Sequence, residues 1–358
     1  MSLLIACAAA AAFAEDEEHQ QPRRIIPPPP SPILSVSAVP GNGDQNPYGV
    51  AFVPEDFPSD GLLSPGDILA SNFNDATNTQ GTGSTIVRIS QSGGPASVFF
   101  QGQPGLGLTT ALGVLKRGFV LVGSVPTTDG TCATVTAGSL LIIDRHGNLV
   151  ATLTDSTLLD GPWDLTIHEK RDQAQVFVSN VLSGTVTRLD LEISDDSDTV
   201  VVESETQIAS GYGTACNAAA VVVGPTGLAY DAHRDILYVA STADNAIYAV
   251  RHARRTQEDE GTGRVVYQDS VHLHGPLALA LAPNGHLITA NGDAINADPN
   301  QSSEIVEFTR EGEFVSQFQI DPVPGSAFGL AVIASDDVIL FAAVDDNTSI
   351  LEEWSEER

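Results

Sequence analysis

Basic residues are scarce in this chain of 358 residues, which has 16 Lys and Arg against 46 Asp and Glu and a formal net charge of −30. Its only lysines are Lys116 and Lys170. A field of this sign repels nucleic acid and anionic lipid, and it attracts cations and cationic partners. Aromatic residues, at 6%, are not interleaved with basic ones as in nucleic-acid-binding surfaces. We therefore predict no nucleic-acid partner. The alternative interpretation of the charge is a solubilising surface for a salty or acidic environment.

The motifs of common catalytic sites are missing. The chain has no Gly-x-Ser-x-Gly elbow, phosphate-binding glycine loop, haem-attachment Cys-x-x-Cys-His or His-Glu-x-x-His pair. His272 and His274 would lie on the same face of a strand and could ligate zinc. No Cys or third His is near them in the sequence, so an ordinary pair is the expectation.

Long apolar runs are missing apart from residues 1–14, which are rich in alanine and end in an Ala-x-Ala pattern at Ala12–Ala14. This run predicts a secretory signal peptide and a secreted, periplasmic or cell-envelope protein. It is too short to span a bilayer, so we expect no transmembrane segment. Residues 4–7 also resemble a lipoprotein box, with lipidated Cys7 as the alternative mature N-terminus. Residues 15–32 form a proline-rich leader, expected to be polyproline II.

Cysteine is nearly absent. Outside the signal only Cys132 and Cys216 remain. Two cysteines in an exported chain favour a disulfide, although two free thiols are the alternative. The sequence therefore predicts a bridge between distant parts of one domain.

A pattern of three short strands recurs along the chain. It is clearest at 224–250, where a Gly-Pro turn precedes apolar and β-branched runs. The copies span residues 46–89, 109–144, 161–191, 224–250, 275–308 and 326–354. A small sheet cannot bury both of its faces alone, and radial repetition solves this as a β-propeller. We predict an all-β, six-bladed β-propeller at residues 33–358 rather than a sandwich or stacked barrels.

The last copy has three strands and no fourth. The alternating run 33–39 before the first copy has no other place to pair. We therefore predict that it supplies the outer strand of the sixth blade and closes the ring, which hides both strand edges. We also expect the protein to be a monomer.

The repeated P-x-G-[LV]-A and [LI]-[YF]-V-[AS]-[ND] motifs resemble the six-bladed propellers of the NHL-repeat, virginiamycin B lyase-like and gluconolactonase/regucalcin-like group. The resemblance covers about residues 46–354. The gluconolactonase-like enzymes hold a divalent metal in the channel through a glutamate, two asparagines and an aspartate in a Pro-Asp-Gly turn. The resemblance therefore implies a metal at the same place in this chain. Here that turn reads Pro225-Thr226-Gly227, and no glutamate opens the first blade. The departure puts lactonase chemistry in doubt.

In a propeller, the start of each inner strand and the end of each second strand lie at the same end of the channel. This predicts a ligand-binding rim that comprises Tyr48, Trp163, Asp164, Thr226 and Phe328. It also predicts oxygen ligands for Ca²⁺ or another divalent cation at Asn72, Asn180, Asn291 and Asp345. Ordinary turn chemistry is the alternative for each of them. A second candidate is a calcium-loop register that comprises Asn296, Asp298, Asn300 and Glu307.

The sequence therefore favours an exported, non-enzymatic binding module for a protein, peptide or glycan. A metal-dependent hydrolase, lactonase or lyase with the ion in the channel is the alternative, and a structural spacer is the third possibility. The motifs define a scaffold more closely than they define an activity.

Overall fold

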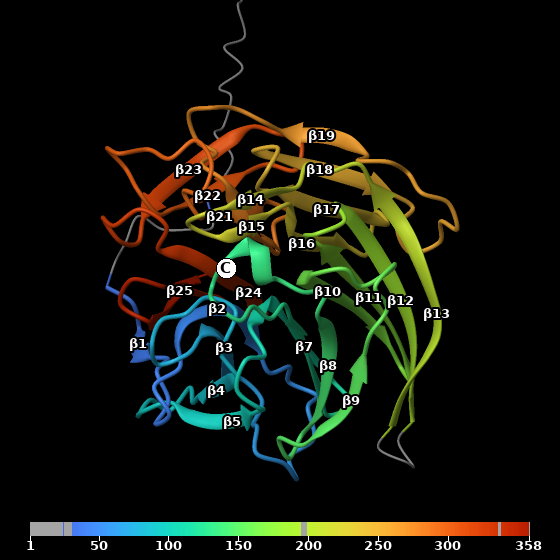
Figure 1. The fold of residues 1–358 in the computed structure, drawn as a ribbon, viewed down its shortest axis with the longest axis vertical. Coiled ribbons are helices and arrows are strands. Elements are labelled where there is room, and N and C mark those ends of the chain that lie inside the picture. The colour runs from blue at the N-terminus through green and yellow to red at the C-terminus, as the bar shows by residue number, and fades with distance from the viewer. Residues whose placement is uncertain (1–23, 25–30, 195–198, 336–337, 358) are drawn as a thin grey trace, which may run out of the picture.

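The computed structural model describes residue 24 and residues 31–194, 199–335 and 338–357. Across this part of the chain it is nearly all β, with one 3₁₀ helix, η1 (Cys132–Thr134), and no α-helix. Six four-stranded antiparallel sheets are arranged around a central axis (Figure 1). The predicted signal peptide and most of the predicted leader lie outside the described residues.

The first five blades follow one another in chain order, each from its inner to its outer strand. Blade 1 comprises β2 (Gln45–Phe52), β3 (Ile68–Asn74), β4 (Thr85–Ile89) and β5 (Ser97–Gln101). Blade 2 comprises β6 (Leu108–Leu115), β7 (Phe119–Ser124), β8 (Ser139–Asp144) and β9 (Leu149–Leu153). Blade 3 comprises β10 (Pro162–Lys170), β11 (Gln173–Asn180), β12 (Thr185–Ser194) and β13 (Thr199–Ser210).

The second half repeats this plan. Blade 4 comprises β16 (Pro225–Asp231), β17 (Ile236–Ser241), β18 (Ala246–Arg251) and β19 (Arg264–Tyr267). Blade 5 comprises β20 (Pro276–Leu281), β21 (Leu287–Asn291), β22 (Glu304–Phe308) and β23 (Phe314–Gln319). Blade 6 comprises β24 (Ala327–Ser335), β25 (Val338–Asp345), β26 (Ile350–Glu357) and β1 (Leu34–Ser37).

Strand composition follows position in the blade. Every residue of the second strand β3, ILASNFN, is buried, because adjacent blades cover both of its faces. The outer strand β9, LVATL, has no buried residue, since only one face meets a neighbour. The pattern of apolar runs inside and mixed strands outside is what let the repeats be detected from the sequence.

A belt of hydroxyl groups ties successive blades together at one end of the channel. In each case a Ser or Thr of an inner or second strand donates to a carbonyl of the next blade. The bonds are Ser71 Oγ to Thr109 O (2.8 Å), Thr109 Oγ1 to Pro162 O (2.8 Å), Ser179 Oγ to Thr226 O (2.7 Å) and Thr226 Oγ1 to Pro276 O (3.2 Å). The predicted rim residue Thr226 therefore belongs to this belt.

The N-terminal strand closes the ring, as the sequence predicted. β1 pairs antiparallel with β26, with Leu34 opposite Glu353 and Ser37 opposite Ile350. The pairing is extended by Ile33 N–H donating to Glu353 O (2.7 Å). The sixth sheet thus joins the two ends of the described chain, and the predicted all-β, six-bladed class is confirmed.

A small hairpin lies over the middle of the ring (Figure 1). It consists of β14 (Ala215–Asn217) and β15 (Val221–Val223), inserted between blades 3 and 4. The predicted disulfide is present: Cys216 of β14 is bonded to Cys132 of η1, with their Cα atoms 5.6 Å apart. The bridge fastens the hairpin to the β7–β8 loop of blade 2.

Replacing both Cys132 and Cys216 by Ser is expected to lower the free energy of unfolding by about 2–4 kcal/mol, because the bridge closes a long loop. The cysteines are 84 residues apart in sequence. Urea unfolding of the two forms measures the effect, and a double variant as stable as the parent would contradict it. A count of free thiols under denaturing, non-reducing conditions checks that the parent is oxidised.

Candidate functional site at the capped end of the channel

We call one end of the propeller the cap face. It is formed by the loops that lead into each inner strand and those that follow each second strand. The antiparallel order of the strands puts both sets of loops at the same end. These loops contain no Lys or Arg, and their aspartates are Asp44, Asp75, Asp129, Asp155, Asp160, Asp244, Asp269, Asp293, Asp298, Asp321 and Asp346.

The opposite end carries the basic residues. The turns between first and second strands and between third and fourth strands contain Lys116, Arg117, Arg145, Arg171, Arg234, Arg254, Arg255 and Arg310. Several of them pair with carboxylates there, as Arg145 Nε does with Asp60 Oδ1 (2.8 Å). The negative potential is therefore concentrated on the cap face, while the opposite end has charges of both signs.

Aromatic side chains close the channel beneath the hairpin. Tyr48 stacks on both Phe73 and Phe328, with ring centroids 4.4 Å apart in each pair. Trp163 meets Phe73 edge-on at 5.5 Å. Val222 of the hairpin packs on the same cluster, which leaves a cavity of about 10 Å³. We call Tyr48, Phe73, Trp163 and Phe328 the aromatic plug.

Three of the predicted ligand-binding residues thus come together, but as buried side chains. Tyr48 and Trp163 are each 1% exposed, and Phe328 is 7% exposed. Burial, with the nearby Asp346 charge, raises the pKa of Tyr48 well above its ordinary value. Trp163 Nε1 has no hydrogen-bond partner within the described structure. Their present role is to seal the channel.

Asp164 lies in the channel below the plug, where it lines a cavity of about 60 Å³ with apolar side chains from the inner strands. Its Oδ1 accepts from Leu165 N–H (2.7 Å) and its Oδ2 accepts from Leu228 N–H (3.1 Å). Burial raises the pKa of this carboxyl well above its ordinary value, although both hydrogen bonds lower it. Asp164 therefore links the inner strands of blades 3 and 4.

The predicted metal ligands occupy equivalent places, and each serves its own blade. Three asparagine amides donate to the loop that leads into the inner strand: Asn72 Nδ2 to Ala38 O (3.1 Å), Asn180 Nδ2 to Leu158 O (3.0 Å) and Asn291 Nδ2 to His272 O (2.8 Å). Asp345 accepts from Asn347 N–H (3.0 Å) and from Thr348 Oγ1. Within the described structure no hydrogen bond joins these four residues to one another.

The channel mouth does not fit the metal site that the gluconolactonase resemblance implies. Where that site would need oxygen ligands, the inner strands open with the buried residues Tyr48, Trp163, Leu277 and Phe328. Asp164, which lines the channel cavity, already accepts two backbone N–H groups. Glu307 also does not act as a ligand in the predicted calcium loop. Its Oε1 pairs with His286 Nδ1 (2.6 Å), and its Oε2 accepts a hydrogen bond from Ser316.

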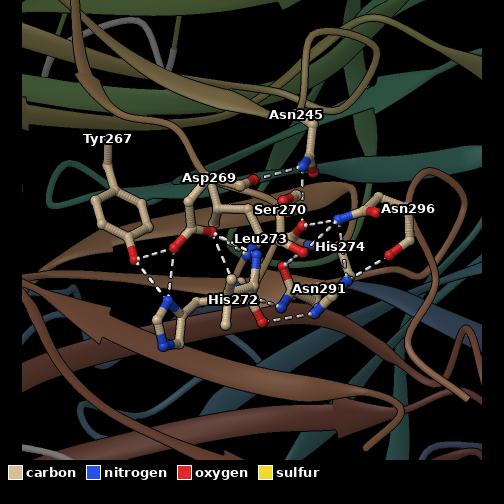
Figure 2. A network of polar contacts seen from close by, with 10 residues as sticks. Asn245, Tyr267, Asp269, Ser270, His272, Leu273, His274, Asn291 and Asn296 are labelled. Carbon is tan, nitrogen blue, oxygen red and sulfur yellow. Dashed lines mark hydrogen bonds and ion pairs between the residues drawn. The ribbon is translucent and has the colours of Figure 1, made fainter. Parts of the chain in front are cut away.

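A polar network that the sequence reasoning missed fills the β19–β20 loop (Figure 2). Asp269 Oδ2 accepts from Tyr267 Oη (2.8 Å) and contacts His272 Nδ1 (2.6 Å). Burial alone would raise the pKa of Asp269, but hydrogen bonds from His272, Tyr267 and backbone amides hold it at about 2. The adjacent Asn245 amide donates to Leu273 O (2.9 Å) and binds this loop to blade 4.

The class defined by these features is a six-bladed β-propeller with a capped channel. No protein-family model and no curated protein matches the chain. Solved structures do match. A gluconolactonase from Xanthomonas campestris is 13% identical, with 93% of this chain and 100% of that chain covered and a TM-score of 0.52. A calcium-binding regucalcin from Agrobacterium tumefaciens is 14% identical, with 90% and 95% covered and a TM-score of 0.51.

An α-L-arabinofuranosidase from Fusarium graminearum is also similar, at 12% identity, 91% and 98% coverage and a TM-score of 0.55. These similarities confirm the predicted propeller fold and its likeness to gluconolactonase and regucalcin at the level of architecture. Within the described residues, no helix is long and apolar enough to cross a membrane.

Proposed function

We propose that this chain is an exported binding module whose cap face binds a cationic segment of a protein or peptide. The observation that carries the proposal is the distribution of charge: the cap-face loops carry many aspartates and no Lys or Arg. Clustered charges of one sign attract an oppositely charged partner and speed its association. The disulfide supports export, because such bonds persist in oxidising compartments.

A cationic peptide fits this face better than a neutral glycan does. Sugar binding commonly depends on exposed aromatic rings, but the aromatic plug lies buried under the hairpin. Burial of the rings leaves polar groups on the cap face, among them the carboxylates of the exposed Asp129 and the half-buried Asp155 and Asp321. Carboxylates near the surface interact weakly one at a time, so a partner must contact several of them together.

The proposal is tested by fluorescence anisotropy with a labelled lysine-rich peptide, using a glutamate-rich peptide as the reverse-charge probe. We expect binding of the lysine peptide alone, weakened at least about tenfold between 50 and 300 mM salt, because salt screens exposed charges. Equal binding of both peptides, or affinity that does not respond to salt, would contradict the proposal.

Two variants of equal net charge localise the effect. The first is Asp129→Asn/Asp155→Asn/Asp321→Asn on the cap face, where each Oδ1 accepts a backbone N–H two residues on. Asparagine keeps that turn contact and removes the charge. The matched control is Asp172→Asn/Glu192→Gln/Glu313→Gln, three exposed residues toward the opposite end. We expect only the first to weaken peptide binding, by roughly tenfold.

A metal-dependent hydrolase acting in the channel is the second candidate, supported by the structural similarity to a gluconolactonase. The buried aromatic plug weighs against it, because a substrate entering from the cap face would have to displace the hairpin to reach Asp164. Hydrolysis of a simple sugar lactone that depends on added Ca²⁺, Mg²⁺ or Zn²⁺ and is lost in Asp164→Asn would favour this candidate.

A further inference from the structure

Three side chains of metal-ligating type come together on the cap face, outside the channel. They are His274 from the β19–β20 loop, Asp298 from the β21–β22 loop and Glu304, the first residue of β22. Their ligand atoms all lie within 4.8 Å of one another, and no other such group occurs among the described residues. Figure 2 shows His274 among Asn291 and Asn296, close to the β21–β22 loop.

Glu304 is the unusual member of this group. It is 1% exposed, and its Oε1 has no hydrogen-bond partner anywhere in the described part of the chain. Its Oε2 accepts one long hydrogen bond, from Asn291 Nδ2 (3.3 Å). A buried carboxylate oxygen that accepts no hydrogen bond destabilises the folded protein unless a cation or a donor binds to it. This side chain therefore points to a ligand that would complete it.

The neighbouring Asp293 adds negative charge to the same place. Its Oδ2 accepts from the N–H groups of Ser303 (2.8 Å) and Gly325 (3.1 Å), while its buried Oδ1 has no partner within the described residues. Burial, reinforced by Asp293 and opposed by His274 and Asn291, raises the pKa of Glu304 to about 7. A bound divalent cation would reverse this repulsion between carboxylates.

His274 is held in place by the surrounding loops. Its backbone N–H donates to Asn291 Oδ1 (3.0 Å), and its ring nitrogens face two carbonyls, Asn296 O and Val271 O (the latter at 3.1 Å). A neutral imidazole has one N–H and can satisfy only one of them. Metal-binding histidines commonly keep one ring N–H on a backbone carbonyl, which fixes the tautomer and frees the other nitrogen for the ion.

We propose that His274, Asp298 and Glu304 bind a divalent transition metal, Zn²⁺ in the first place. One imidazole nitrogen and two carboxylates are a ligand set that zinc accepts, whereas calcium takes oxygen ligands in greater number. Zinc–ligand distances of about 2.0–2.2 Å place ligand atoms roughly 3.3 Å apart. Small side-chain rotations would bring the ligand atoms from their present separation, within 4.8 Å, to this distance. The ion fastens the loops 268–275 and 292–303 to β22.

Isothermal titration of the purified, chelator-treated protein with Zn²⁺, Mn²⁺ and Ca²⁺ tests the site. We expect one zinc per chain, weaker Mn²⁺ and the weakest Ca²⁺ binding, together with a zinc-induced rise in melting temperature. Glu304→Gln and Asp298→Asn should each weaken zinc binding at least about tenfold, since even residues that only support a ligand have effects of this size. Co²⁺ should give visible absorption bands in the parent that disappear in His274→Gln.

The matched control is His286→Gln. His286 and Glu307 form a histidine–carboxylate pair (Nδ1 to Oε1, 2.6 Å) at the opposite end of the same blade. This variant should bind zinc like the parent. Circular dichroism of each metal-free variant verifies folding. If Glu304→Gln does not fold, because Glu304 is buried, the Asp298→Asn variant still tests the site, since Asp298 is partly exposed. Absence of zinc binding would overturn the proposal. Equal loss in His286→Gln, or unchanged affinity in both Glu304→Gln and Asp298→Asn, would also overturn it.

Discussion

Deletion of residues 33–39 is expected to lower the free energy of unfolding by roughly 5 kcal/mol, which is much of a typical domain's stability. The segment includes the four residues of β1, which pair with β26. Beyond the strand, Ala38 N–H donates to Ser349 O (2.8 Å), and Ala38 O accepts from Asn72 Nδ2 (3.1 Å). Leu34 and Val36 pack on the main core cluster, and Ala38 is fully buried. Removing all of this leaves the edge of β26 open.

Urea unfolding of the deletion and of a matched variant that lacks only residues 1–30 measures the effect. The matched variant is expected to unfold like the parent, because it keeps every ring-closing contact of the described residues, from Ile33 onward. A milder change, Val36→Pro, removes one N–H from the β1–β26 ladder and should give an intermediate loss. If the deletion unfolds at the parent's urea concentration, the sixth blade does not need its N-terminal strand.

The fold could be predicted from the sequence because each blade repeats one pattern. The Gly-Pro turn and the apolar runs at 224–250 locate β16, β17 and β18 closely. The ring closure followed from a missing strand at one end of the chain and a surplus strand at the other. The disulfide followed from there being only two cysteines outside the predicted signal peptide. These inferences need the order of elements and no knowledge of how side chains point.

The cap could not be predicted in the same way. The run Val221–Val223 is apolar and precedes an inner strand, so nothing in its pattern distinguishes a separate hairpin from a strand of the blade. Once the hairpin covers the channel, Tyr48 and Trp163 become buried instead of forming an open rim. Their position along the inner strands was predicted, but their exposure depends on a distant insertion.

The asparagines illustrate a second limit. The sequence shows that Asn72 and Asn180 occupy equivalent positions in their blades. It does not show that their amide groups donate hydrogen bonds to the loop before each blade. The group at His274, Asp298 and Glu304 depends on how the side chains of two separate loops, 268–275 and 292–303, meet beside the start of β22. Repeats predict the scaffold, whereas individual loops decide which polar groups meet.

Replacing Trp163 by Ala is expected to cost about 3–5 kcal/mol of folding free energy, because a large buried ring leaves a cavity that its neighbours cannot fill. Trp163 is 1% exposed and lies edge-on to Phe73 at 5.5 Å and to Tyr48 at 6.0 Å. The existing cavity at the plug is only about 10 Å³, so the packing there is close. The loss is measured by urea unfolding.

Trp163→Phe is the control that separates packing from ligand contact. It keeps an aromatic ring and removes an indole N–H that has no partner in the described structure, so we expect a smaller cost than for Trp163→Ala, about 1–2 kcal/mol from the smaller cavity. Because the ring is buried, both variants should bind the lysine-rich peptide as the parent does under conditions where they are folded. Weaker binding by a folded Trp163→Phe variant would instead assign Trp163 to the ligand site, since the stability of that variant cannot account for the loss.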